Sequence, residues 1–193
     1  MNPPLADQKA VLRRQIRDRS ARISSGDRAF FSTQICAHLR QQRIWQDAGA
    51  VLFYAPLPEE VDVWPLLPEA LSGGKTVALP RYDRYHQLYV ACQIKNLARD
   101  LRSGRFNVKE PATSCVELPL NQLDLILVPG VGFDLNGHRL GRGQGYYDRM
   151  LAAVRGTKCG LAFDFQVETE IPAEPHDVTL NWIVTPSRWW SIS

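Results

Sequence analysis

The chain has 193 residues, of which 45% are hydrophobic and 22% are charged, and its formal net charge is +3. This length predicts a single domain spanning residues 1–193, and the apolar fraction is sufficient for a buried core. The net charge suits a small anionic ligand but is too weak to indicate nucleic-acid binding by itself.

The cysteines are too widely spaced to form a CxxC zinc or redox motif. They are Cys36, Cys92, Cys115 and Cys159. We expect reduced, mostly buried thiols in a cytoplasmic protein. The N-terminal segment MNPPLADQKAVLRR has no apolar stretch typical of a secretory signal, and no segment reaches the roughly 18 apolar residues of a membrane span.

Spacing of apolar residues predicts a first helix over residues 6–22. Its apolar positions are Val11, Leu12, Ile16 and Ile23. Lys9, Arg13 and Arg17 recur every four residues and therefore share another face of this helix.

The sequence Ser24-Ser25-Gly26 interrupts this pattern, and a second helix follows it. Asp27 is a candidate N-cap for the second helix. The residues expected on its inner side are Phe30, Phe31, Ile35 and Leu39.

The remainder of the chain alternates between short apolar runs and helical segments. Strands are expected at 50–55, 76–79, 88–94, 124–128, 158–163 and 182–185. Of these, 124–128 (DLILV) is the clearest buried strand, and Pro80 is expected to end the strand at 76–79. Helices are expected before Gly73-Gly74 and over 145–154, whereas 95–120 shows no usable periodicity.

Alternating strands and helices predict an α/β three-layer sandwich with a mainly parallel central sheet and helices on both faces, a Rossmann-like arrangement. Ligands of such folds bind at the carboxyl ends of the strands. The loops after Ala55, Val128 and Phe163 are therefore expected on one rim, and they contain most of the unusual polar residues.

The segment GHRLGRGQGYYDR, residues 137–149, concentrates glycine, arginine and tyrosine. Glycines can approach a ligand closely, exposed N–H groups can bind anions, and the start of the helix at 145–154 would add its positive end. Arg139 and Arg142 add fork-shaped donors for phosphate oxygens. The motif is neither a Walker A sequence nor GxGxxG, and a glycine-rich turn with solvated arginines remains the alternative to a polyphosphate site.

Tyr146, Tyr147 and Asp148 close this segment. Two adjacent tyrosines on a helix point about 100° apart, so one can join the core while the other offers its face to an aromatic ligand. Asp148 is either a metal ligand beside the phosphates or the partner of a nearby arginine.

The continuous segment from Asp124 to Asp148, DLILVPGVGFDLNGHRLGRGQGYYD, resembles the signature of the 5-formyltetrahydrofolate cyclo-ligase family, also called 5,10-methenyltetrahydrofolate synthetase. Further pieces follow the family's order: KAVLR near the start, EEVD after the first strand, LPRY, KEP, and HD before a strand ending IVT. The resemblance implies ATP- and Mg²⁺-dependent conversion of 5-formyltetrahydrofolate to 5,10-methenyltetrahydrofolate. Its Phe133-Asp134 pair is expected to support the loop.

The resemblance also implies roles for individual residues. Those expected to contact ATP are Lys9, Arg13, Arg139, Leu140, Gly141, Arg142, Gly143, Gln144, Gly145, Tyr146 and Tyr147. Those expected to contact the folate are Ala55, Glu60, Arg142, Tyr146 and Tyr147, with Tyr147 stacked on the pterin. Arg139 and Arg142 are the expected catalytic residues, and Asp148 and Asp177 the expected Mg²⁺ ligands. The partners are these two small molecules, for a monomeric enzyme.

Three other functions fit parts of the sequence. The first is an ATP-dependent ligase or kinase of the same fold with a non-folate substrate, and the second is a non-catalytic module that binds folate or nucleotide. The third is RNA binding by the basic N-terminal helix, but Asp7 and Asp18 interrupt its charge and no aromatic platform accompanies it.

Overall fold

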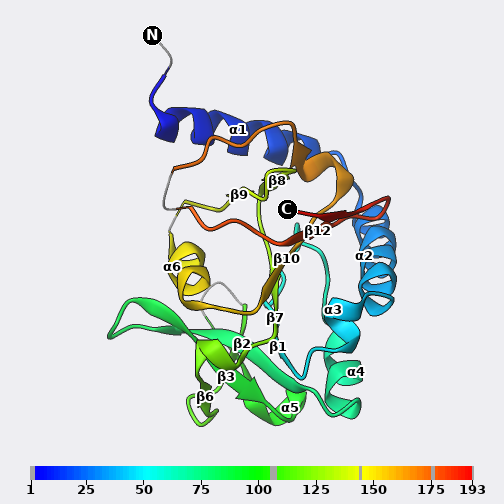
Figure 1. The fold of residues 1–193 in the computed structure, drawn as a ribbon, viewed down its shortest axis with the longest axis vertical. Helices are drawn as coiled ribbons and strands as arrows, with labels where there is room; N and C mark the ends of the chain where they lie inside the picture. Colours follow the sequence, from blue (N-terminus) through cyan, green and yellow to red (C-terminus); the bar gives the residue numbers. More distant parts are fainter. Residues whose placement is uncertain (1–2, 105–107, 144, 175–176, 193) are drawn as a thin grey trace.

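An eight-stranded sheet runs through the centre of the molecule, in the order β13-β12-β10-β7-β1-β2-β3-β6 (Figure 1). The computed structural model describes residues 3–104, 108–143, 145–174 and 177–192. The strands of this sheet are β1 (Ala50–Leu52), β2 (Thr76–Asp83), β3 (Leu88–Ile94), β6 (Glu117–Leu118), β7 (Leu125–Val128), β10 (Thr157–Leu161), β12 (Trp182–Val184) and β13 (Trp189–Ser191). The consecutive neighbours from β12 to β2 pair in parallel, and β13, β3 and β6 add antiparallel pairs at the two edges.

Both faces of the sheet are covered, which confirms the α/β fold with a mainly parallel sheet. The helices α2 (Ser25–Arg40), α3 (Arg43–Gln46) and α4 (Leu66–Ser72) lie on one side, and α6 (Tyr146–Ala153) lies on the other (Figure 1). Every residue of β7 is buried, and alternate side chains enter different core clusters. Leu125 and Leu127 pack on the α2 side, while Ile126 and Val128 pack on the α6 side.

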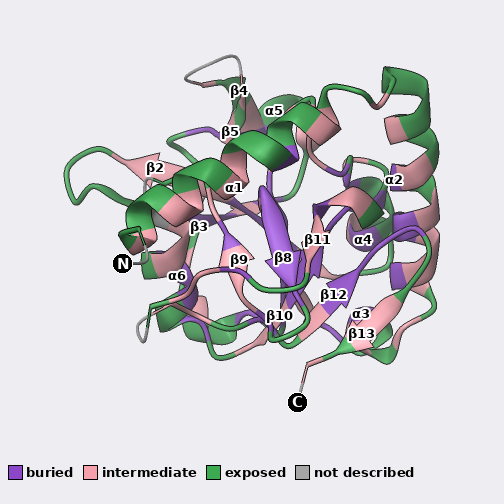
Figure 2. Ribbon diagram, turned by 90° about the horizontal axis from the view of Figure 1, so that it is seen from above, coloured by how far each residue is buried: buried purple, intermediate pink, exposed green. Residues whose placement is uncertain are grey.

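A second, three-stranded sheet lies at the carboxyl ends of the parallel strands. It has the order β11-β8-β9, with β8 (Gly132–Asp134), β9 (Arg139–Leu140) and β11 (Val167–Glu168). Helix α1 (Leu5–Ser20) crosses above it (Figure 2). Ile16 packs there with Val131, Leu140 and Ile171. A Cβ at Gly132 would lie 2.5 Å from Ile16 Cδ1, so α1 needs a glycine at this point of contact.

Several boundaries differ from the sequence-based expectations. Pro80 does not end β2, which pairs with β3 as far as Asp83. Pro80 is tolerated because β1 pairs with β2 only as far as Ala78, so a proline beyond it removes no hydrogen bond to β1. Residues 95–120 form short pieces, which explains their lack of periodicity. These are α5 (Leu97–Asp100), β4 (Leu101–Ser103), β5 (Lys109–Pro111), β6 and a 3₁₀ turn (Leu120–Gln122).

The two N-terminal helices also need correction. Ser24, not Asp27, caps α2, because its hydroxyl accepts a hydrogen bond from the Asp27 N–H at 3.0 Å. Phe30 is 60% exposed and Val11 is 45% exposed, so neither belongs to the core. Within the described ranges, no helix combines the length and apolar character that crossing a membrane requires.

Candidate active site

Three distant segments meet at the carboxyl ends of the parallel strands: the loop after β1, the loop between β9 and α6, and helix α1. Arg142 contacts Glu59 and Glu60, and Arg13 contacts Gly141. The expected rim is thus present. The loop after β10 joins it through Gln166, which donates to the carbonyls of Gly130 and Val131 at 3.0 and 3.1 Å.

The glycine-rich segment is anchored from below by Asp134, which is fully buried. Its carboxylate accepts hydrogen bonds from the backbone N–H groups of Asn136, His138 and Ile171 at 2.8–2.9 Å, and it pairs with His138 Nδ1 at 3.0 Å. A buried carboxylate with this many donors fixes the turn between β8 and β9. The expected supporting role of Phe133-Asp134 agrees with this geometry.

Arg139 is held almost entirely inside the protein, with 5% of its side chain exposed. It donates to Asp148 Oδ1 at 2.5 Å and to the Pro129 carbonyl at 3.3 Å, and its guanidinium lies 5.6 Å from the centre of the Tyr147 ring. Arg139 therefore ties the start of α6 to the end of β7. Its guanidinium N–H groups are engaged by Asp148 and Pro129, so Arg139 would act on a ligand through its charge rather than through a pair of unoccupied hydrogen-bond donors.

The backbone between β9 and α6 requires glycine at two positions. Gly143 has φ +96° and Gly145, the N-cap of α6, has φ +64°. Arg13 of α1 closes over this loop, because its Nε donates to the Gly141 carbonyl at 2.8 Å. Gln144 and the Tyr146 side chain lie outside the part of the chain that the structure describes.

A wide cleft of about 580 Å³ opens between α1, the glycine loop and the segment around Asp177. Its polar lining includes Lys9, Arg13, Asp148, Arg149, Glu174 and Asp177, with the backbone of Gly143 and Gly145. Lys9 Nζ bonds to Asp177 Oδ2 at 2.8 Å and lies 3.7 Å from Glu174. The cleft therefore gathers two of the expected phosphate-binding cations, Lys9 and Arg13, and both expected metal-binding carboxylates, whereas Arg139 and Arg142 are not among its lining residues.

Asp148 and Asp177 fit a magnesium ion in their chemistry. Mg²⁺ prefers oxygen donors, and it commonly binds through one or two carboxylates together with phosphate oxygens and waters. In the described ranges no group of three or more His, Cys, Asp or Glu side chains is placed to hold a metal. These two carboxylates thus suit an ion that arrives with a phosphate ligand, and each now pairs with a cation, Arg139 or Lys9.

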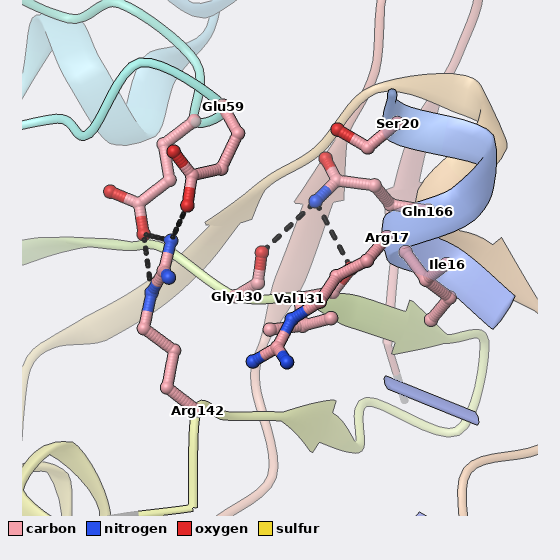
Figure 3. Close-up of a pocket in the computed structure, with 9 residues that line it drawn as sticks. Ile16, Arg17, Ser20, Glu59, Gly130, Val131, Arg142 and Gln166 are labelled. Carbon is pink, nitrogen blue, oxygen red and sulfur yellow. Dashed lines mark hydrogen bonds and ion pairs between the residues drawn. The ribbon is translucent and has the colours of Figure 1, made fainter. Parts of the chain in front are cut away.

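A second, narrow space of about 30 Å³ lies beside the cleft, lined by Arg17, Glu59, Glu60, Arg142 and Gly130 among others (Figure 3). Arg142 Nη2 donates to Glu59 at 2.8 Å and to Glu60 at 3.1 Å, and its Nε lies 3.3 Å from Glu60. The other oxygen of Glu60 accepts from the Leu57 N–H at 3.0 Å. Arg142 therefore joins the glycine loop to the loop after β1.

The two carboxylates that hold Arg142 differ in acidity. Burial raises the pKa of Glu60, whose side chain is only 9% exposed, and this outweighs the opposing effects of the Leu57 N–H and Arg142. For Glu59, burial acts in the same direction, but the hydrogen bond from Arg142 prevails and lowers the pKa. Glu60 is thus the weaker acid of the two, because burial dominates its pKa, whereas Arg142 keeps Glu59 ionised.

Two expected contact residues are less accessible than the sequence suggested. The Leu140 side chain is fully buried under α1. Tyr147 packs against both core clusters, with its ring centre 5.9 Å from that of Tyr89 and with Arg139 over one face. Tyr147 therefore joins the core. Ala55 lies half-buried in the loop after β1.

Sequence reasoning assigned no role to Glu59, Arg17 or Gln166. Glu59 lies directly beside Glu60 in the sequence, and this position was a usable signal. Arg17 shares the spacing of Lys9 and Arg13, which was visible in the sequence. Gln166 carried no signal, because its contacts with Gly130 and Val131 exist only after folding.

Comparison with known proteins gives a consistent result. A model of the 5-formyltetrahydrofolate cyclo-ligase family matches residues 6–186. The 5-formyltetrahydrofolate cyclo-ligase of Escherichia coli K12 is 33% identical over 74% of this chain and 81% of its own length. The Mus musculus protein of the same name is 27% identical over 91% of this chain and 92% of its own length.

Solved structures agree in fold. The NMR structure of Aquifex aeolicus 5,10-methenyltetrahydrofolate synthetase matches with a TM-score of 0.86 at 32% identity, covering 95% of this chain and 92% of that one. A Mycoplasma pneumoniae 5,10-methenyltetrahydrofolate synthetase shares the fold with a TM-score of 0.74 at 23% identity. Because the family model spans nearly the whole chain, this chain belongs to the 5-formyltetrahydrofolate cyclo-ligase family and is an enzyme of that activity.

Proposed function

We propose that the wide cleft and the adjoining narrow pocket bind ATP and 5-formyltetrahydrofolate side by side, and that the products are 5,10-methenyltetrahydrofolate, ADP and phosphate. The observation that carries this proposal is the position of Arg142. It extends from the glycine loop beside the cleft to Glu60 in the neighbouring pocket. One flexible cation thus lies between the two substrate sites.

The chemistry requires two substrates in contact. The formyl oxygen of an N-formyl group leaves poorly, because the group is amide-like. Transfer of the γ-phosphoryl group to that oxygen breaks the bond to ADP and makes the oxygen a good leaving group. N10 of the same folate then attacks the formyl carbon, loses its proton and expels phosphate. The protein contributes positioning and neutralisation of charge.

On the nucleotide side, Lys9, Arg13 and the N–H groups of the glycine loop hold the triphosphate. Asp148 and Asp177 hold Mg²⁺, which when bound neutralises phosphate charge. The present ion pairs support this assignment, since Lys9 and Asp177 already lie together in the cleft. With Mg²⁺ and ATP bound, Asp177 would be a metal ligand, and Lys9, released from Asp177, would be free to bind a phosphate.

On the folate side, Glu60 orients the pterin by accepting its N–H donors. Glu60 is now engaged by Arg142 and Leu57, and the narrow pocket is too small for a pterin ring. Arg142 therefore leaves Glu60 for the phosphoryl group when both substrates are present. Gly141 and Gly143 on either side of Arg142 give the backbone freedom for this movement.

We further propose that the protein is a cytoplasmic monomer that acts on small molecules and not on nucleic acid. The basic residues of α1 serve the phosphates in this proposal.

The test is a spectroscopic assay with purified protein, ATP and 5-formyltetrahydrofolate, with and without Mg²⁺. We expect the ultraviolet absorbance of the conjugated methenyl product to grow only when all three are present, with one ADP formed per product. ATP consumption with a different carboxylate or amine substrate, but not with the folate, would indicate a ligase or kinase of another specificity. Tight folate binding without product would indicate a non-catalytic binding module.

A further inference from the structure

Arg17 occupies the boundary between the two substrate spaces. It follows Lys9 and Arg13 along one face of α1, with about 6 Å along the helix axis between successive members. Lys9 and Arg13 line the wide cleft, whereas Arg17 lines the narrow pocket with Glu59, Glu60 and Arg142 (Figure 3). The same helix thus carries its positive charge from the nucleotide side to the folate side.

Arg17 differs from Lys9, Arg13 and Arg19 of α1 in how its charge is used. Lys9 pairs with Asp177, Arg19 pairs with Glu168, and Arg13 donates to the Gly141 carbonyl. Over the described ranges, the structure assigns no hydrogen bond or ion pair to the Arg17 guanidinium. Burial and then the like charge of Arg17 lower the pKa of Arg13, so the two cations repel each other without a carboxylate between them. The Arg17 side chain is exposed and shares its pocket with Glu59 and Glu60, but both of these carboxylates are held by Arg142, which leaves the Arg17 guanidinium open to an anion.

The proposed reaction indicates which anion would come close to Arg17. The γ-phosphoryl group starts beside Lys9 and Arg13, moves to the formyl oxygen beside Glu60, and finally departs as phosphate. While Arg142 holds Glu60, the narrow pocket of about 30 Å³ admits a group of a few atoms but not a ring system. We propose that Arg17 donates hydrogen bonds to the phosphoryl group during its transfer and then to the released phosphate, making it a further catalytic residue. This inference rests on the proposed function.

The test compares Arg17→Gln and Arg17→Lys with Arg14→Gln as a matched control. Arg14 is an exposed arginine of the same helix and lines neither space. For Arg17→Gln we expect kcat to fall about 10²–10³-fold, the usual loss for one charge-stabilising donor, while the KM for ATP changes less than about threefold. Arg17→Lys keeps the charge without the fork and should recover part of the rate. Arg14→Gln should match the wild type.

A second readout does not depend on turnover. Calorimetric titration with inorganic phosphate should show affinity about tenfold weaker for Arg17→Gln than for the wild type and Arg14→Gln, at equal thermal stability. If the wild type makes no product but phosphate binding depends on Arg17, the anion site stands and the proposed reaction is wrong.

Two results would overturn the inference. One is an Arg17→Gln enzyme with unchanged kcat and unchanged phosphate affinity. The other is unchanged kcat with a raised folate KM that grows as glutamates are added to the substrate. The second result would assign Arg17 to the carboxylates of the folate tail.

Discussion

The wide cleft and the narrow pocket use their charges in different ways. Arg139 does not line the cleft but supports Asp148, which does; it is 5% exposed and is also held by the Pro129 carbonyl and the Tyr147 ring. In the pocket, Arg142 is 39% exposed and is shared by two carboxylates. The two arginines are separated only by Leu140 and Gly141. Arg139 is nevertheless buried, whereas Arg142 is partly exposed and is held only through its guanidinium by Glu59 and Glu60.

This difference suggests how the loop between β9 and α6 could contribute to both the ATP site and the folate site. The cleft can accept a triphosphate by exchanging side-chain partners, because its volume is already about 580 Å³. The pocket, about 30 Å³, must lose the contact between Arg142 and Glu60 before it can accept a pterin. We therefore expect variants of the cleft to change metal and ATP requirements, and variants of the pocket to change turnover and the coupling between substrates.

The largest effect is expected for Arg142→Ala, the change that removes the movable cation. Steady-state assays should show kcat lowered about 10²–10³-fold, because a donor to the transferred group is lost. The melting temperature should change little, since exposed ion pairs contribute about 0–1 kcal/mol. Arg142→Lys should recover only part of the rate. Wild-type turnover in Arg142→Ala at low ATP would show that the phosphates are held without this loop.

A smaller effect is expected when the cleft loses a carboxylate. Asp177→Asn and Asp148→Asn should each raise the Mg²⁺ concentration for half-maximal rate about 10–100-fold, because a neutral amide is a weaker ligand. Titration of activity with Mg²⁺ at saturating ATP measures this shift. Asp47→Asn, an exposed aspartate after α3, is the control. If neither site variant differs from this control, the metal is held elsewhere.

The narrow pocket should also make kcat/KM for the folate depend on pH in the acidic range, through the ionisation of Glu60. Burial raises the pKa of Glu60, and the pterin N–H groups need its ionised form. Below that pKa, kcat/KM for the folate should fall about tenfold per pH unit, and it should level off above it. Glu60→Gln should lower kcat/KM and remove the slope. Glu59 has a lowered pKa and should not contribute there. A slope that persists in Glu60→Gln would assign the titration to another group.

The smallest effect is expected for Glu59→Gln. This variant is informative because we expect it to bind ATP more tightly than the wild type. Removing one of the two carboxylates that hold Arg142 leaves phosphate with less competition. The KM for ATP should fall about two- to fivefold, matching the roughly 0.5–1 kcal/mol of a partly exposed ion pair. An increased KM would mean that Glu59 holds Arg142 in its active position rather than away from it.

The glycine-rich segment could be located from sequence because its residue types are local signals. Glycine at 143 and 145 predicted unusual backbone geometry, and both positions have positive φ. Of the tyrosine pair, Tyr147 packs against the core, and the face expected for an aromatic ligand on the other tyrosine stays a prediction. Tyr147 was the tyrosine expected to stack on the pterin, yet it packs against the core. The sequence could not show this, because the side of α6 that faces the core depends on how α6 packs.

Edges and short pieces of the fold were harder to predict. The continuation of β2 beyond Pro80 depends on where β1 stops pairing with it. The strands of β8, β9 and β11 have only two or three residues each, too few for a periodic pattern.

The sequence by itself determined the alternation of strands and helices, the buried central strand at Leu125–Val128, and a phosphate-binding type of loop after it. These follow from apolar periodicity and from the backbone freedom of glycine, which act over a few neighbouring residues. Only the tertiary structure decided that Arg139 is buried against Asp148, that Arg142 pairs with Glu59 and Glu60, and that Arg17 lines the narrow pocket. Those contacts join residues far apart in the chain, so they exist only once α1 has packed over β8 and β9 and the loops have met at the end of the sheet.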